Sequence, residues 1–336
     1  MRARDLGIAV GEHRPAAQNA ITDVEGVRVG HTTLLDGNAI RTGVTIVVPP
    51  ETPIFAGCHR LNGNGELTGL EWVRESGFLT TPIGITNTFS VGVVRDAIAA
   101  ESADEDAWSL PVVGETFDGF LNDIRGQHVT SEHVRQALSS ASADAVEEGS
   151  VGGGTGMICH EFKAGIGTAS RVVAGYTVGV LVQANYGRRN RFRVNGVPVG
   201  ELIGNDIPLP QGRDESGSII GIVATDAPLL PQQCNRLAQR MGLGVGRMGG
   251  TAAHSSGDLF FAFATGNRAL IGKGEVSLRM LSDPEITPFY EAVIEATEEA
   301  ILNSMLAADT MTGRDGNTVH ALDPDLLLEV LQARRA

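Results

Sequence analysis

The chain of 336 residues has few cysteines and aromatic residues, and it contains no long apolar run. Its three cysteines are far apart and lack C-x-x-C spacing, which argues against a disulfide framework or a zinc knuckle and suits a reducing compartment. No window approaches about 18 uninterrupted apolar residues, so we expect no membrane span. The first residues contain no apolar h-region. We therefore expect no signal peptide and a cytoplasmic location.

Basic residues are also scarce relative to acidic ones. The formal net charge is −14 and the isoelectric point is about 5.0. Because such a surface repels phosphate backbones, nucleic acid is not an expected partner. One basic cluster, YGRRNRFRV at 186–194, is expected to lie on a solvated strand or hairpin, with a local anion site as the alternative.

Several motifs for cofactors and metals are absent or misplaced. GVGRMG at 244–249 matches the dinucleotide fingerprint but follows a predicted helix instead of a strand, so we interpret it as a chance match. GSVGGGTGM at 149–157 lacks a P-loop lysine and is expected to form a close-packed turn that lines a cleft. There is no G-x-S-x-G elbow and no His pair around a Glu. We expect neither a metal nor a cofactor.

Glycine, in contrast, is abundant, with 43 residues that predict many tight turns and close backbone contacts. Near-continuous apolar segments bounded by Gly, Pro and Asp predict buried strands at 26–34, 43–49, 176–187, 218–230 and 257–266. Helices are predicted at 131–149, 231–244 and 287–309, and the polar interval 189–217 is expected to form a hairpin and a surface loop. Without a convincing linker, residues 1–336 are expected to form one layered α/β or α+β domain.

The stretch GGTAAHSSGDLFFAFATGN at 249–267 carries the chemical hypothesis. A loose run of small residues leads into Ser255 and Ser256, which stand before a predicted strand. If the bond between these serines breaks, Ser256 gains an α-amine with a pKa of about 7.7–8.0 beside its own hydroxyl, so nucleophile and base arise together. His254 is expected to be a polar loop residue, with assistance to cleavage as its alternative role.

The sequence resembles the L-aminopeptidase/D-esterase family of self-processing hydrolases (peptidase family S58), which includes the β-peptidyl aminopeptidases. The similar blocks run along nearly the whole chain. They include DVEGVRVGHTTL at 23–34, LNGNGELTGLEWVRESG at 61–77, ETFDGFLNDI at 115–124, GSVGGGTGMICHEFKAGIGTASR at 149–171, SGDLFFAFATGN at 256–267 and ATEEAILNSMLAADTMTGRDGNT at 296–318.

This resemblance implies a precursor that cuts itself before Ser256 into an α chain, 1–255, and a β chain, 256–336. It implies an α+β fold in four layers, an α-β-β-α sandwich like that of N-terminal-nucleophile hydrolases but with different connectivity. It also implies release of N-terminal residues from peptides, amides or esters, and a homo-oligomer of α/β pairs. Relatives commonly carry Gly or Asn where this chain has Ser255, so the choice between Ser255 and Ser256 stays open.

The resemblance also suggests residue roles beyond the nucleophile, Ser256. The family forms its oxyanion hole from an Asn side chain and a backbone N–H, and Asn185 is the candidate here, with the segment around Asp226 as the alternative. A carboxylate should bind the substrate ammonium group. Glu148 is the first choice and Glu115 the second. The alternative interpretation of either residue is a solvated charge at a helix end or in a loop.

A Ser/Glu pair in relatives orients the nucleophile. The stretch LSDPE offers Ser282 and Glu285 for this role, although a helix cap or a turn explains these residues equally well.

Two other functions remain open. One is an acyltransferase of the ornithine acetyltransferase type, and the other is an uncut, non-catalytic binding protein of the same fold.

Overall fold

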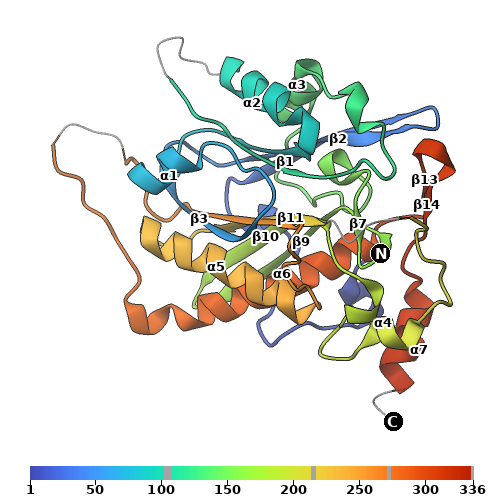
Figure 1. The fold of residues 1–336 in the computed structure, drawn as a ribbon. Helices are drawn as coiled ribbons and strands as arrows, with labels where there is room; N and C mark the ends of the chain where they lie inside the picture. The colour runs from blue at the N-terminus through green and yellow to red at the C-terminus, as the bar shows by residue number, and fades with distance from the viewer. Residues whose placement is uncertain (102–107, 213–216, 271–273, 334–336) are drawn as a thin grey trace.

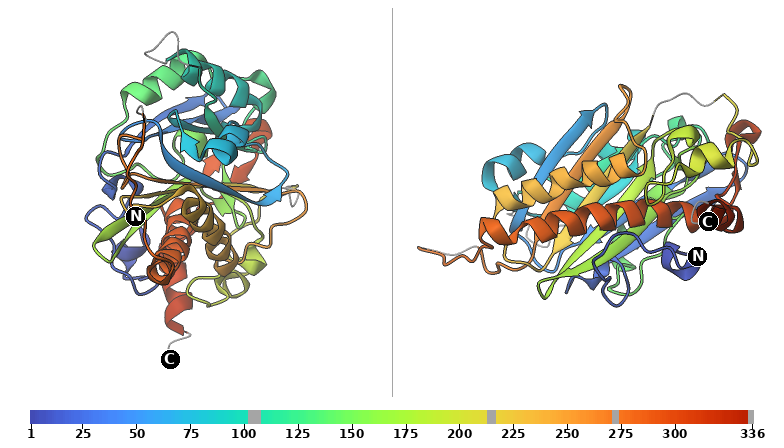
Figure 2. Two further views of the ribbon diagram at one scale, coloured as in Figure 1. Left: turned by 90° about the vertical axis from the view of Figure 1, so that its left-hand side faces the viewer. Right: turned by 90° about the horizontal axis from the view of Figure 1, so that it is seen from below.

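The computed structural model describes residues 1–101, 108–212, 217–270 and 274–333. Two β-sheets lie face to face, and helices cover the outer face of each, so the chain forms four layers (Figure 1). The turned views in Figure 2 show the same layering, with two long helices side by side across one sheet. The expected α-β-β-α sandwich is therefore confirmed.

The smaller sheet has four strands in the order β1-β2-β5-β6. Its strands are β1 (Arg28–Asp36), β2 (Ile40–Val48), β5 (Ile83–Asn87) and β6 (Val112–Thr116). The larger sheet has the order β4-β3-β12-β11-β10-β9. Its strands are β4 (Phe78–Leu79), β3 (Ile54–Gly63), β12 (Gly257–Ala264), β11 (Ser218–Thr225), β10 (Tyr176–Asn185) and β9 (Ile166–Val173). Only the pairs β5/β6 and β11/β12 are parallel among the described residues, and the other pairs are antiparallel.

Helices pack on both outer faces. The small sheet carries α2 (Val91–Ala100) and α3 (Ser131–Ser139), and the large sheet carries α5 (Pro231–Arg247) and α6 (Thr287–Leu306). Smaller elements complete the chain: α1 (Leu70–Ser76), α4 (Val199–Ile203), α7 (Pro324–Ala333), and the short hairpins β7 (Ile158–Cys159)/β8 (Phe162–Lys163) and β13 (Met311–Thr312)/β14 (Thr318–Val319).

The alternation of side chains along β12 explains its central place. Leu259, Phe261 and Phe263 point into the core between the two sheets, whereas Phe260 and Ala262 point into the core under α5 and α6. Because successive strand residues face opposite sides, a strand that is apolar at every position must be covered on both faces. The near-continuous apolar runs in the sequence therefore identified the interior strands.

The predicted strands are all present, but two other predictions need correction. Residues 131–149 form a helix only as far as Ser139. The interval 189–217 contains one isolated bridge, Val194 to Val197, and α4 instead of a hairpin, and its residues 213–216 lie outside the described part of the chain. Within the basic cluster, Arg189 is buried and its backbone N–H binds the carboxylate of Glu161, so this part is not a solvated strand.

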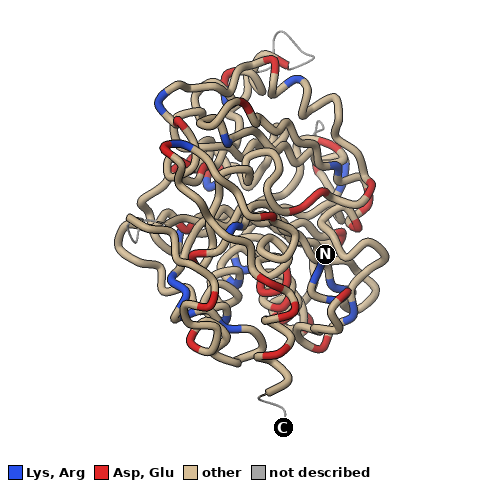
Figure 3. The backbone as a smooth tube through the Cα atoms, turned by 90° about the vertical axis from the view of Figure 1, so that its right-hand side faces the viewer, with Lys and Arg blue, Asp and Glu red and all other residues tan. Residues whose placement is uncertain are grey.

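Charges elsewhere on the surface are mixed. Lys and Arg are interspersed with Asp and Glu on the face shown in Figure 3. None of the helices in the described ranges is long and apolar enough to cross a membrane.

One ion cluster is buried where β9 meets α6. The Arg171 guanidinium is completely buried and contacts the carboxylates of Glu295 at 3.1 Å and Glu299 at 2.8 Å. Arg4 also binds Glu299, at 3.0 Å, which ties the N-terminal segment to the same helix. Buried charges are tolerated only when they are paired, so these residues have to be assembled together.

We therefore expect Arg171→Met to destabilise the fold by about 3–5 kcal/mol, since it leaves two carboxylates buried without their main partner. Urea denaturation measures this change. Arg314→Ala is the control, because Arg314 pairs with Asp315 on the exposed surface and its loss should cost less than about 1 kcal/mol. Equal effects of the two substitutions would contradict the importance of the cluster.

Candidate active site

The bond between Ser255 and Ser256 lies directly before β12, where the chain enters the large sheet. Ser256 is 3% exposed, and its N–H donates to the Ala253 carbonyl at 2.8 Å. The next N–H, from Gly257, donates to the Gly217 carbonyl at the start of β11 at 3.2 Å. The predicted cleavage site is therefore fixed to a central strand pair.

The hydroxyl of Ser256 donates a hydrogen bond to the carboxylate of Asp258 at 2.6 Å. Asp258 is buried, and burial raises its pKa to about 6, although the bond from Ser256 acts in the opposite direction. We did not predict Asp258 from the sequence. The sequence did contain a signal for it, since Ser256 and Asp258 are two positions apart and residues at i and i+2 lie on the same side of a strand.

Two asparagine amides, one near the end of β3 (Asn62) and one directly after that strand (Asn64), bind the backbone around this bond. Asn64 Nδ2 donates to the Ser255 carbonyl oxygen at 2.7 Å, and the Asn64 N–H donates to the Ser256 carbonyl at 3.1 Å. Asn62 Nδ2 donates to the carbonyls of Ala253 and Ser256, both at 2.7 Å. These asparagines were also missed, because their partners are carbonyls nearly 200 positions away in the sequence.

Glycine is required where this segment crosses the start of β12. A Cβ atom on Gly257 would lie 2.5 Å from the Asn64 carbonyl oxygen, and one on Gly65 would lie 3.0 Å from Gly257 Cα. The first distance is shorter than real Cβ contacts allow, and the second is tighter than most of them. The two backbones can therefore approach closely enough for the Asn64 side chain to reach the Ser255 carbonyl.

Next to the Ser255–Ser256 bond is a pocket of about 520 Å³. It is lined by Asn64, Gly65, Glu66, Thr88, Glu115, Phe117, Gly217, Ser218 and Ser255. Glu115, on β6 of the small sheet, is 4% exposed and accepts hydrogen bonds from the Glu66 N–H at 3.0 Å and from the Thr88 hydroxyl. Burial raises the pKa of Glu115, and its hydrogen-bond donors are neutral. The pocket therefore contains a carboxylate suited to a cationic ligand.

Asn185 lies at the same end of the large sheet. The strand register aligns it with Ser218, and Ser218 with Gly257, so it stands two strands away from the cleavage site. Its Oδ1 accepts from the Ile158 N–H at 3.0 Å, and its Nδ2 donates to the carbonyl of Phe117 at 2.9 Å. Asn185 thus binds the backbone of a pocket residue in this structure.

Glu148, the first choice for an ammonium site, has a different position. It forms an ion pair of 2.7 Å with Arg2 and accepts from the Thr168 N–H at 2.7 Å. Its side chain is buried by these partners, and it does not line the pocket. Of the two carboxylates expected as ammonium ligands, Glu115 is the one that lines the pocket, and ammonium binding stays a prediction.

Ser282 and Glu285 are exposed and lie far from the site. They flank the turn before α6, where Arg236 of α5 binds Asp283 at 3.2 Å. Arg236 is near the start of α5, whereas the cleavage site follows the end of this 17-residue helix, which is about 25 Å long. The structure therefore does not bring the pair to Ser256, and a turn role explains them.

Asp226 is also remote from the cleavage site. It follows the last residue of β11, at the opposite end of that strand from Ser218, and it accepts from the Thr177 N–H at 2.7 Å. His254, by contrast, is close in sequence and exposed, as expected for a polar loop residue.

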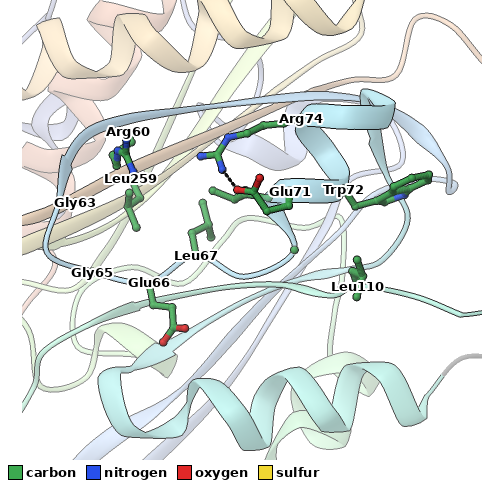
Figure 4. Close-up of a pocket in the computed structure, with 12 residues that line it drawn as sticks. Arg60, Gly63, Gly65, Glu66, Leu67, Glu71, Trp72, Arg74, Leu110 and Leu259 are labelled. Atoms are coloured by element: carbon green, nitrogen blue, oxygen red, sulfur yellow. Dashed lines mark hydrogen bonds and ion pairs between the residues drawn. The ribbon is translucent and has the colours of Figure 1, made fainter.

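A second pocket, of about 380 Å³, lies along the same segment and shares Gly65 and Glu66 with the first. Leu67, Leu110 and Leu259 give it an apolar wall, with Trp72 at one end and the Glu71–Arg74 ion pair above (Figure 4). The two pockets together give a surface that extends away from the Ser255–Ser256 bond.

These features define the class of protein: an α-β-β-α sandwich with a buried serine at the start of a central strand and a carboxylate in the adjoining pocket is a serine hydrolase of the N-terminal-nucleophile type. The model of peptidase family S58 matches residues 19–319. The chain belongs to this family and is a hydrolase of the aminopeptidase type.

Individual relatives agree with this assignment. A beta-peptidyl aminopeptidase, BapA, of Sphingosinicella microcystinivorans is 46% identical over 99% of this chain and 92% of its own. The structure of a beta-aminopeptidase of Burkholderia sp. is 52% identical, with a TM-score of 0.93 and 99% of both chains covered. The L-aminopeptidase D-Ala-esterase/amidase of Ochrobactrum anthropi, described as a new variant among the Ntn hydrolase fold, is 40% identical with a TM-score of 0.92 over 99% of both chains.

The corrected position of Glu148 leads to a stability prediction. Glu148→Ala removes the partner of Arg2 and of a buried N–H, so it should destabilise the chain by about 2–4 kcal/mol in urea denaturation. At temperatures where the variant is folded, kcat/KM should stay within about twofold of the unsubstituted enzyme. A selective rise in KM at unchanged stability would restore Glu148 as a substrate ligand.

Proposed function

We propose that the chain cuts itself between Ser255 and Ser256 and then acts as an aminopeptidase with Ser256 as its N-terminal nucleophile. The observation that carries this proposal is the position of the Ser255–Ser256 bond, beside a pocket whose buried carboxylate, Glu115, has only neutral hydrogen-bond donors. Cleavage would produce the chains 1–255 and 256–336. Strand pairing of β12 with β3 and β11 supports the new terminus on both sides.

In the proposed reaction, the Ser256 hydroxyl attacks the carbonyl carbon of the substrate and its own α-amine accepts the proton. An unperturbed α-amine has a pKa of about 7.7–8.0, which suits a general base near neutral pH. The leaving amine departs with a proton from the Ser256 ammonium group. Water then hydrolyses the acyl-enzyme and restores the serine.

Substrate selection follows from Glu115. A free N-terminal ammonium group placed in the pocket forms a charge-assisted hydrogen bond with this carboxylate, which is stronger than a bond between neutral groups. The names of the relatives described above indicate that those proteins act on beta-peptides, or on L-aminoacyl and D-Ala compounds. We propose β-aminoacyl amides as the first substrate class and L- and D-aminoacyl amides as the second.

The alternative functions have less support. The three relatives described above are named as aminopeptidases, or as an esterase and amidase, and none of these three is named as an acyltransferase or a binding protein.

An oligomer of α/β pairs and a cytoplasmic location remain predictions. Native mass spectrometry and cell fractionation test these two statements.

Self-cleavage is tested by intact-mass measurement of the unsubstituted chain, Ser256→Ala and Ser255→Ala. We expect two fragments from the unsubstituted chain and from Ser255→Ala, with a fragment that starts at Ser256, and one full-length chain from Ser256→Ala. Cleavage of Ser256→Ala with loss of cleavage in Ser255→Ala would assign the nucleophile to Ser255. An unsubstituted chain that stays whole after prolonged incubation at neutral pH would remove the proposal.

Ammonium recognition is tested with Glu115→Gln, which keeps the shape of the side chain and removes its charge. Charged hydrogen bonds contribute about 1.5–3 kcal/mol, so kcat/KM for β-alanyl p-nitroanilide should fall about 10- to 150-fold. Hydrolysis of a matched ester without an amino group should change little. Glu66→Gln is the control, since Glu66 lines the same pocket but is exposed. Equal losses on both substrates would contradict ammonium binding by Glu115.

A further inference from the structure

Self-cleavage has a chemical requirement that substrate turnover does not have. Before the cut, the nitrogen of Ser256 is part of a peptide bond, and an amide nitrogen is not a base. The α-amine proposed for turnover is therefore absent in the first step, and another group must remove the proton from the Ser256 hydroxyl. The oxygen of the Ser255 carbonyl likewise needs a hydrogen-bond donor while it carries negative charge.

We propose that Asp258 and Asn64 carry out this first step, with Asp258 as the general base and Asn64 as the donor to the oxyanion. This inference rests on the self-cleavage proposed above and assigns its catalytic residues. Both side chains touch reacting atoms: Asp258 Oδ1 is 2.6 Å from Ser256 Oγ, and Asn64 Nδ2 is 2.7 Å from the Ser255 carbonyl oxygen.

Asp258 satisfies the geometric requirement for a general base, which is a hydrogen bond to the proton that it removes. It is 1% exposed, and Ser256 is its only hydrogen-bond donor among the described contacts. It sits on the strand that immediately follows the reacting bond, so its position relative to Ser256 is fixed by two residues of extended backbone. A solvated loop carboxylate would not have this fixed position.

Asn64 is exposed, but its backbone is held by contacts on both sides. Its N–H donates to the Ser256 carbonyl at 3.1 Å, and its own carbonyl packs against Gly257. Asn62 binds the carbonyls of Ala253 and Ser256, which lie before and after the reacting carbonyl. A donor that is already in place stabilises developing charge without a cost of reorganisation.

The step can be written with its atoms balanced. Asp258 takes the hydroxyl proton as Ser256 Oγ bonds to the carbonyl carbon of Ser255, and the oxyanion accepts from Asn64 Nδ2. The C–N bond then breaks, the departing nitrogen takes the proton from Asp258, and an ester joins the Ser255 carbonyl to Ser256 Oγ. Water hydrolyses this ester to a Ser255 carboxylate, a free hydroxyl and a free amine on Ser256.

The rate of cleavage should depend on the ionisation of Asp258. Burial raises the pKa of Asp258 to about 6. The titratable group that faces it is Tyr186, directly after β10, whose pKa burial raises well above its usual value, so the phenol is neutral near pH 6. Its neighbour on β3 is Asn62, which does not titrate. Because the base must be ionised, cleavage should slow about tenfold per pH unit below pH 6 and level off above it.

The test follows the conversion of newly made full-length chain, produced by a short cell-free translation pulse, into the fragment 256–336 by intact mass. Asp258→Asn should slow conversion at least 100-fold, and Asn64→Ala should slow it 10- to 100-fold. Asp36→Asn and Asn205→Ala are matched controls, because both residues are exposed and lie outside the pocket beside the bond. Both controls should convert at the unsubstituted rate.

Two further measurements separate chemistry from misfolding. Asn64→Asp has the shape of asparagine without its N–H donor and should be at least as slow as Asn64→Ala. The pH profile of the unsubstituted chain requires no variant, and a rate that is equal at pH 5 and pH 7 would overturn the role of Asp258. Conversion of Asn64→Asp at the unsubstituted rate would overturn the role of Asn64. If the unsubstituted chain itself does not convert, self-cleavage fails as a whole, which is a distinct result.

Discussion

The pairing of β12 with a strand on each side is the interaction on which this structure depends. The ladder to β3 is antiparallel and the ladder to β11 is parallel, and together they hold all eight residues from Gly257 to Ala264. A parallel neighbour requires a long crossover, and α5 supplies it by packing over the large sheet. The chain between α5 and β12 must therefore return to the same end of the sheet, and Ser255 and Ser256 lie in that return. A break there leaves both ladders intact, and the residues after it remain fixed by α6 against β9 and β10.

Close backbone contact around the start of β12 determines what the Ser255–Ser256 bond can meet. A Cβ on Gly257 would prevent the approach of the two segments, and one on Gly65 would make it tight. Because neither residue has one, the Ser255 carbonyl is reached by the short amide side chain of Asn64 from the adjacent segment. Glycine in this region is therefore a requirement of the site as much as of the fold.

Local pattern predicted the interior strands and a layered domain, whereas the four-layer sandwich and Ser256 as the nucleophile were implied by the resemblance to the family. Apolar runs identify strands that are covered on both faces, and the Ser-Ser-Gly-Asp stretch marks the entry into one of them. The polar partners could not be predicted in the same way. Glu148 and Glu115 both look like loop or strand-end charges, and only tertiary structure shows that one binds Arg2 while the other lines the pocket. Ser282 and Glu285 follow the nucleophile closely in sequence, but β12 and the segment after it carry the chain to the far end of α5.

The segment 62–66 joins the two chemical tasks of the site. Asn62 and Asn64 bind the carbonyls around the Ser255–Ser256 bond, and two residues later the Glu66 N–H binds Glu115 on the small sheet. The groups proposed for self-cleavage thus lie on or directly beside strands of the large sheet, whereas the proposed ammonium recognition would require the two sheets to be stacked. Because one short segment contacts both, any displacement of it would affect cleavage and substrate binding together. The arrangement would couple the proposed self-cleavage to the integrity of the proposed substrate pocket, because both depend on the position of segment 62–66.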